Sequence, residues 1–185
     1  TAGGVQYVAC AGNFKDAGLE YTGALKVLQM IFSYEYLWIQ IRVKGGAYGC
    51  MCSFSDQGDS MFVTYRDPNL SESYKVYDEA ADYVADFDAD DRDMKKYIIG
   101  TIGSMDMPME AVDMGARSFH AYFLGKTEAD LQKVRDQVLS CTQEDIRALA
   151  PIVKAVVEAG NRCCIGNEEK IDQNKEYFDE VKHVL

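Results

Sequence analysis

The pattern of apolar and polar positions predicts a few strands early in the chain, followed by a series of helices. Residues 5–14, VQYVACAGNF, are rich in β-branched and aromatic side chains, which is typical of a strand. In residues 47–54, AYGCMCSF, alternation places four side chains on one side of a second strand: Tyr48, Cys50, Cys52 and Phe54. The turn-forming segment SDQGDS leads from there into residues 61–66, MFVTYR, so we expect these two strands to pair as a hairpin.

Residues 22–44 predict one long helix between the first and second strands. Apolar side chains recur along it every three or four positions and form a stripe: Leu25, Leu28, Phe32, Tyr36, Ile39 and Val43. Much of the remaining helix surface is apolar too, so we expect this helix to be buried on most sides. Gly45 and Gly46 are expected to end it, because a residue without a Cβ tolerates left-handed backbone geometry.

The rest of the chain is predominantly helical. Thr127 with Asp130, and Thr142 with Asp145, have the spacing of helix-capping pairs. We interpret Gly100 and Gly103 as relieving crowding where helices pack. Helices are expected at 71–87, 88–105, 108–125, 127–141 and 142–160, followed by a strand at 162–167 and a polar helix from Glu168.

This order of elements predicts an α+β fold in which helices pack on one face of a mostly antiparallel sheet. The length of 185 residues suits a single domain, residues 1–185, and no proline-rich linker or internal repeat divides it. The chain begins with Thr1 rather than Met, and we expect it to be a piece of a longer polypeptide.

Composition and charge exclude several classes of partner. The chain has 30 acidic and 19 basic residues, a net charge of −11, so it offers no basic face for nucleic acid. No apolar run approaches the roughly 20 residues that a bilayer span requires. The six cysteines form no CxxC pair, which favours free thiols in a reducing compartment. No signal segment is visible, and we expect a cytoplasmic location.

The familiar catalytic motifs are missing. The two histidines, His120 and His183, have no second histidine or glutamate at zinc-peptidase spacing, so we expect no self-contained zinc site. We expect His120 to lie on or beside an apolar helix face in a structural role. The sequence also contains no nucleophile elbow, and GTIGSM lacks the lysine of a phosphate-binding loop.

Arg42 and Tyr48 remain as candidate functional residues on either side of the two glycines. Arg42 in a last helical turn can simply offset the negative end of the helix, and Tyr48 can be an ordinary half-buried strand residue. Alternatively, the glycine corner lets the guanidinium and the phenol converge on one point in a cleft. Two fixed donors there could orient a peptide carbonyl and stabilise an oxyanion.

Three stretches together resemble a known family. They are EYTGALKVLQMIFSYEYLWIQIRVKGGAYG (20–49), YRDPNL (65–70) and KKYIIGTIGSMD (95–106). In this order they closely resemble the C-terminal region of presequence-protease-like enzymes, which belong to the insulysin/pitrilysin group of zinc metallopeptidases. The similarity runs from about Val5 to Ala150.

The resemblance implies a function for the candidate pair. Such enzymes comprise four related α+β domains, whose two halves close around a peptide-sized chamber. Zinc is held by an HxxEH motif and a distal glutamate in the N-terminal half. The C-terminal half supplies an arginine and a tyrosine that reach the substrate beside the metal, and these match Arg42 and Tyr48. The resemblance therefore implies zinc in the full-length enzyme, a short unstructured peptide as substrate, and an isolated fragment that binds no metal and is inactive.

Two other interpretations stay open. The chain can be a non-catalytic peptide-binding or scaffold domain of the same fold, whose partner half has lost the metal ligands. It can also be an unrelated α+β interaction module, although that leaves the long match unexplained.

Overall fold

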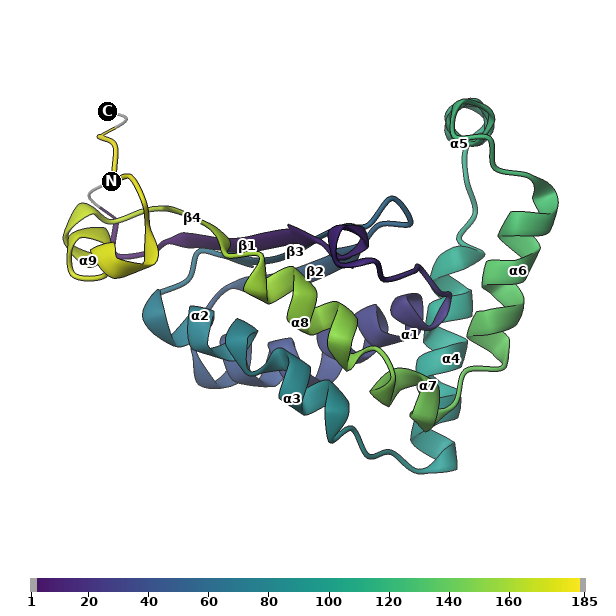
Figure 1. Ribbon diagram of the computed structural model, residues 1–185, viewed down its shortest axis with the longest axis horizontal. Coiled ribbons are helices and arrows are strands. Elements are labelled where there is room, and N and C mark those ends of the chain that lie inside the picture. The colour runs from purple at the N-terminus through teal and green to yellow at the C-terminus, as the bar shows by residue number, and fades with distance from the viewer. Residues whose placement is uncertain (1–2, 184–185) are drawn as a thin grey trace.

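The computed structural model describes residues 3–183, and a four-stranded antiparallel sheet runs through its centre (Figure 1). The strands are β1 (Tyr7–Asn13), β2 (Gly49–Phe54), β3 (Asp59–Tyr65) and β4 (Asn161–Ile165). Their order across the sheet is β2-β3-β1-β4, and every neighbouring pair is antiparallel. The predicted strands, the hairpin and the α+β class are confirmed.

The two faces of the sheet have different surroundings. Cys10 pairs with Phe62, and Phe62 with Cys52, so these three side chains share one face, where all are buried. Alternation sends their neighbours to the opposite face. That open face carries exposed apolar side chains: Tyr7, Met51, Met61, Tyr65 and Ile165. Within residues 3–183, helices therefore cover only one face of the sheet.

The long helix forms where it was predicted, but its geometry changes partway. It begins as α1 (Ala24–Ile31) and continues as two π-helical segments, η2 (Phe32–Tyr36) and η3 (Trp38–Lys44). In a π-helix each N–H bonds five residues back instead of four. The Leu37 N–H, for example, donates to the Phe32 carbonyl.

The expected apolar stripe is correct only in its first part. Leu25, Leu28, Phe32 and Tyr36 are buried as expected, but Ile39 is 37% and Val43 64% exposed. The wider π turns advance each side chain by a smaller angle than α turns, so the buried row continues through Leu37 and Ile41. The expectation that this helix is buried on most sides is wrong, since Tyr34 and Trp38 are exposed as well.

Three further helices pack with the long helix beneath the sheet (Figure 1). These are α2 (Ser71–Asp78), α3 (Ala80–Ala85) and α8 (Ala150–Glu158). The single helix expected at 71–87 is interrupted at Glu79, where ψ is −5°. The helix expected at 142–160 is likewise divided, with α7 (Gln143–Arg147) preceding α8.

Aromatic packing joins the helices to the sheet at the centre of the core. Phe32 lies 5.7 Å from Phe62 of β3 and 6.1 Å from Tyr83 of α3, measured between ring centroids. Tyr36 stacks on Tyr83 at 4.5 Å, and its hydroxyl donates to the Val76 carbonyl. The first part of the long helix is thus anchored by large buried rings.

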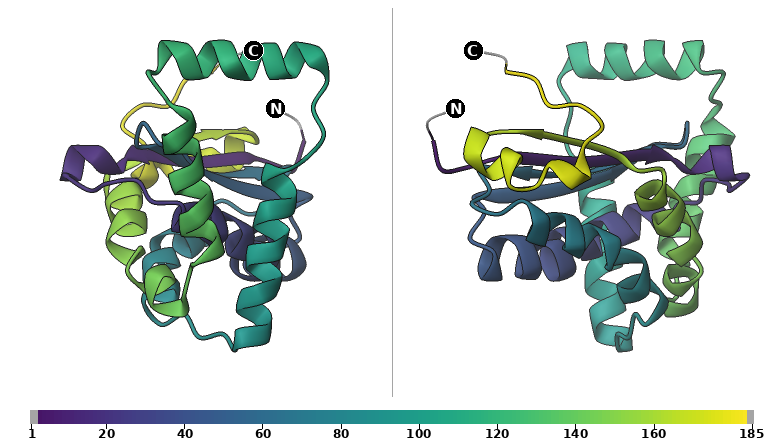
Figure 2. Two further views of the ribbon diagram at one scale, coloured as in Figure 1. Left: turned by 90° about the vertical axis from the view of Figure 1, so that its right-hand side faces the viewer. Right: turned by 60° about the vertical axis from the view of Figure 1, so that its left-hand side comes forward.

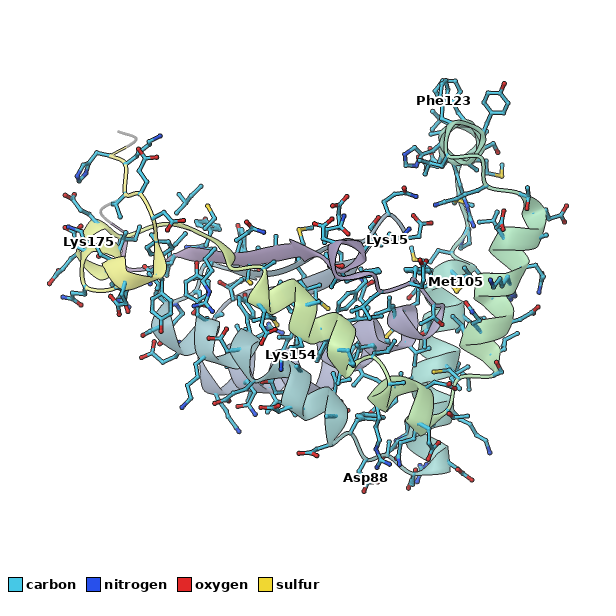
Figure 3. All side chains as sticks on the ribbon, viewed as in Figure 1. Lys15, Asp88, Met105, Phe123, Lys154 and Lys175 are labelled. Atoms are coloured by element: carbon cyan, nitrogen blue, oxygen red, sulfur yellow. The ribbon has the colours of Figure 1, made fainter. Side chains whose placement is uncertain are left out.

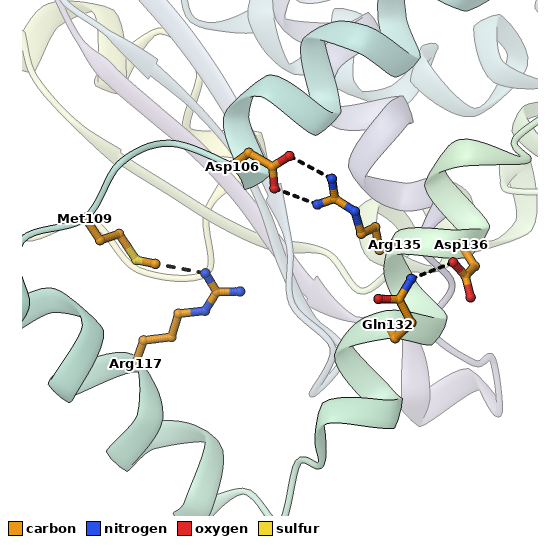
Figure 4. A network of polar contacts seen from close by, with 6 residues as sticks. All are labelled: Asp106, Met109, Arg117, Gln132, Arg135 and Asp136. Carbon is orange, nitrogen blue, oxygen red and sulfur yellow. Dashed lines mark hydrogen bonds and ion pairs between the residues drawn. The ribbon is translucent and has the colours of Figure 1, made fainter.

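A second group of helices extends from one end of the molecule. α4 (Asp91–Met105) and α6 (Glu128–Leu139) pack against each other. At one end of this pair Arg135 forms a bidentate ion pair with Asp106, at 2.6 and 2.7 Å (Figure 4). Both predicted capping boxes, at Thr127 and Thr142, are confirmed.

α5 (Ala111–Phe123) projects above the open side of the sheet (Figure 2). It begins three residues later than the expected start at Pro108, and none of its side chains is buried. Phe123 lies on the side of α5 away from the sheet (Figure 3). His120 is exposed on this helix, which also carries the exposed apolar side chains of Phe119 and Phe123, and its structural role stays a prediction.

The short elements lie at the margins of the fold. η1 (Phe14–Ala17) follows β1, while α9 (Glu168–Asp172) and η4 (Lys175–Tyr177) follow β4. No helix formed by residues 3–183 has the length and apolar character that a bilayer span requires.

Two glycines give a matched test of this packing. A Cβ at Gly12 would lie 2.5 Å from the Val156 carbonyl oxygen, so Gly12→Ala should lower the free energy of unfolding by about 1–3 kcal/mol. At Gly103 no atom of residues 3–183, apart from its own helix backbone and chain neighbours, lies within 4 Å of an added Cβ, so the expected relief of crowding there is wrong. Gly103→Ala should raise that free energy by about 0.5–1 kcal/mol, because alanine favours the helix. Urea unfolding of both variants measures this, and equal effects would contradict the packing.

Candidate functional site

The corner between the long helix and β2 carries both candidate residues. Arg42 lies in the last turn of η3, and Tyr48 immediately precedes β2. Gly46 adopts the left-handed conformation, with φ of 79°, as the sequence predicted for the helix end. The N–H of Gly46 donates to the Arg42 carbonyl and that of Ala47 to the Ile41 carbonyl, at 3.0 and 3.1 Å. The corner is thus a tight, hydrogen-bonded reversal.

Arg42 is held by an aromatic ring rather than by a carboxylate. Its guanidinium carbon lies 4.0 Å from the ring centroid of Trp38, one turn earlier on the helix. This cation–π contact restrains the flat face of the guanidinium. Among residues 3–183 no carboxylate lies within ion-pair distance of Arg42, so its N–H edges are available to an external acceptor.

Tyr48 is held on the open side of the sheet and is 68% exposed. Its ring meets Tyr65 edge to face at 5.8 Å, and Tyr65 meets Tyr7 in the same way at 5.4 Å. Its N–H donates to the Arg66 carbonyl at 3.4 Å. Tyr48 therefore does not share the buried side of β2 with Cys52, which corrects the predicted alternation. The physical reason is that Tyr48 lies in the bend before the strand, where alternation does not apply.

The two candidate side chains flank one corner, and neither is sealed in the interior, since Arg42 is half-buried. Their convergence on a single point in a cleft stays a prediction. Two surface hollows lie elsewhere in the fold. One of about 500 Å³ lies beside Asp78 and Arg162, and one of about 300 Å³ beside Tyr21 and Lys126. Neither hollow is lined by Arg42 or Tyr48.

The thiols nearest to this corner are not nucleophiles at neutral pH. Cys50 and Cys52 lie on the buried side of β2 as predicted. Burial raises the pKa of the Cys50 thiol to about 11, although the nearby Arg42 guanidinium acts in the opposite direction. Burial also raises the pKa of Cys52 strongly. Both side chains thus remain protonated and serve as packing groups.

The described part of the chain contains no group of three or more histidine, cysteine, aspartate or glutamate side chains placed to hold a metal ion. The donors at the corner are a cation and a phenol, which suit an anionic or carbonyl oxygen rather than a metal. The site can therefore bind and polarise an acceptor.

Sequence reasoning missed three features of the site. In the sequence Trp38 is one of many apolar residues of the long helix, although its spacing of four from Arg42 indicates a contact. Tyr65 was counted only as a strand residue. The loop that contacts the corner, residues 65–70, was noted only for its resemblance.

Both the family model and the curated relatives match most or all of the chain. The family described as the PreP C-terminal domain matches residues 2–167. Protein HypA of Clostridium perfringens is 43% identical over 185 residues, covering 100% of this chain and 19% of that protein. Presequence protease 1, chloroplastic/mitochondrial, of Arabidopsis thaliana is 34% identical over 185 residues, covering 98% of this chain and 17% of that protein. The chain thus spans less than a fifth of these curated relatives.

Solved structures support the fold. A Bordetella pertussis protein assigned as a zinc protease superposes with a TM-score of 0.64 at 15% identity, covering 88% of this chain and 93% of that chain. The inactive peptidase domain of a protein assigned as a zinc protease in Bordetella parapertussis gives 0.62 at 14% identity, covering 89% and 91%. At such low identity the likeness concerns the fold alone.

The raised pKa of Cys50 makes its reactivity testable. Since two pH units separate about 11 from the ordinary value of 9.0, its thiolate fraction at pH 8 should be about 100-fold below that of an unperturbed thiol. Iodoacetamide at pH 8 should therefore modify exposed Cys163 rapidly and Cys50 slowly, with Cys50 labelling accelerating toward pH 11. Peptide mass spectrometry measures both. Equal rates at pH 8 would contradict the burial of Cys50.

Proposed function

Because the chain belongs to the family of PreP C-terminal domains, we propose that residues 1–185 form the substrate-binding C-terminal domain of a zinc-dependent endopeptidase. In this proposal the zinc lies in an N-terminal half of the same polypeptide. The observation that carries it is the pair of available donors at the glycine corner, on a chain whose described residues offer no metal site.

The proposed role of the pair is to bind the peptide backbone beside the scissile bond. Arg42, its face held against Trp38, donates from its N–H edges to a carbonyl oxygen. Tyr48 donates from its phenol, whose ring is held against Tyr65. As that carbonyl becomes an oxyanion, both hydrogen bonds strengthen, which lowers the barrier. Zinc, where bound, polarises the carbonyl and lowers the pKa of the attacking water.

The open face of the sheet supports a peptide as the substrate. Exposed tyrosines and methionines continue from Tyr48 across this face, and an extended peptide held at the corner can lay its apolar side chains on them. The net charge of −11 favours basic, unstructured peptides. Closure of the two halves would bring the donors to the metal, so that turnover depends on a domain motion.

A second function has one specific observation in its favour. The described residues hold no group of metal-ligating side chains, so peptide binding at the corner does not itself require a metal on this part of the chain. The chain can accordingly serve as a peptide-binding or scaffold domain in a protein whose other half lacks zinc ligands. An HxxEH motif in the N-terminal half would favour the enzyme, and its absence would favour the scaffold.

The compartment is not decided by these relatives. The plant relative is named chloroplastic/mitochondrial, whereas another comes from the bacterium Clostridium perfringens. A cytoplasmic location stays a prediction.

Substitution of the pair in the full-length protein tests the proposed role. Arg42→Ala should lower kcat for peptide hydrolysis roughly 10²–10³-fold, which is the usual cost of losing one oxyanion donor. Tyr48→Phe should lower kcat as well. Zinc content and thermal unfolding should not change, because neither side chain is a ligand or part of the core.

Two matched controls lie on the same helix. Lys44→Ala removes an exposed cation two residues from Arg42, and Tyr34→Phe removes the hydroxyl of a tyrosine that is 65% exposed. Both should retain full turnover. Unchanged turnover in Arg42→Ala and Tyr48→Phe alike would refute the assigned role.

A further inference from the structure

The loop YRDPNL, residues 65–70, lies against the corner that separates Arg42 from Tyr48. Residues 66–70 connect β3 to α2, and the loop reaches the corner although Asn69 and Gly45 lie 24 positions apart in the sequence. The Pro68 side chain lies 3.6 Å from the position that a Cβ on Gly46 would occupy. From the other side, Lys170 of α9 donates to the Pro68 carbonyl. The loop is therefore held between the corner and the end of the chain.

Asp67 anchors this loop in the interior. Its side chain is fully buried, and both carboxylate oxygens are occupied, one by the Asn69 N–H at 2.9 Å and the other by the Ser73 hydroxyl at 2.6 Å. Its own backbone N–H and carbonyl pair with Gln6 at 2.8 and 2.7 Å. A buried carboxylate with these partners fixes the loop to the start of β1 and of α2.

Asn69 connects this anchored loop to the corner by a hydrogen bond. Its side-chain amide donates to the carbonyl of Gly45 at 2.6 Å. The last carbonyls of a helix lack partners within the helix, so this contact satisfies one of them from outside. Gly45 is the C-cap residue of η3, three residues after Arg42 and three before Tyr48. The amide of Asn69 thus contacts the midpoint of the segment that joins the two candidate donors.

Arg66 provides a second contact between the loop and the corner, and its own backbone is strained. It has a φ of 50°, a left-handed conformation that is unusual for a residue with a side chain. Such a conformation persists only where surrounding contacts enforce it. The carbonyl of Arg66 accepts the Tyr48 N–H. The loop consequently contacts both the corner and the backbone of Tyr48.

We propose that Asn69 is a positioning residue, whose bond to the Gly45 carbonyl sets the angle between the helix that carries Arg42 and the bend that carries Tyr48. This inference rests on the proposed function of that pair. The hydrogen bonds donated by the Gly46 and Ala47 N–H groups close the reversal from within, and the Asn69 amide adds a restraint from outside on the carbonyl at its midpoint. Because a misplacement of about 1 Å can cost about 10²-fold in rate, loss of the restraint weakens transition-state binding more than substrate binding.

Two variants of the full-length protein test Asn69. Asn69→Ala removes the donor, and the isosteric Asn69→Asp keeps the volume but replaces the donating amide with an acceptor. Both should lower kcat about 10–100-fold while KM changes less than about threefold. If the alanine variant does not fold, the aspartate variant carries the test.

A matched control lies at the opposite edge of the sheet. The side-chain amide of Asn161 donates to the Ala11 carbonyl at 3.2 Å, which is the same type of contact far from the corner. Asn161→Ala should retain wild-type kcat. An equal loss in this variant would show that any such bond matters only for folding and would overturn the proposal.

A double-mutant cycle separates positioning from general stability. In the Arg42→Ala, Tyr48→Phe background, Asn69→Ala should cost less than about threefold in kcat/KM, because the groups it positions are gone. An undiminished loss in that background would overturn the inference. If the background substitutions themselves leave turnover unchanged, the proposed function fails; if they reduce turnover while Asn69→Ala and Asn69→Asp do not, only the positioning role fails.

Discussion

The left-handed backbone of Gly46 is the constraint on which the candidate site depends. It reverses the chain directly after the long helix and separates Arg42 from Tyr48 by a few bonded residues. Each donor then rests on an aromatic ring, Trp38 or Tyr65, which limits its freedom. In the proposed role, two donors restrained on a short reversal form a preorganised site for a hydrogen-bond acceptor, and such sites stabilise developing charge without having to rearrange.

Much of the fold could be predicted because its signals are local. The strands, the hairpin, the glycine helix end and both capping boxes depend on residues within a few positions of one another. The π-helical turns could not be predicted, because apolar periodicity was judged against α-helical spacing, and Ile39 and Val43 were therefore placed on the buried side. The break before α8 has a local signal in Pro151 in the first turn of that helix, whereas the break at Glu79 has no comparable signal.

For the site, the two donors and the family resemblance could be identified from the sequence, but the residues that hold the donors in place were not identified. The contact between Trp38 and Arg42 could have been predicted from their helical spacing. The burial of Asp67 and the bond from the Asn69 amide to the Gly45 carbonyl depend on contacts between segments far apart in the sequence, which no local pattern contains. The apolar surface of α5 and of the open sheet face fits a chain that spans less than a fifth of its curated relatives.

The most direct test of the account is a structure of the full-length protein with an uncleaved peptide bound. The account predicts that the Arg42 guanidinium and the Tyr48 hydroxyl both lie within about 3.2 Å of carbonyl oxygens of the peptide beside the metal, a normal hydrogen-bond distance. A peptide bound elsewhere, or donors directed away from its backbone, would contradict it.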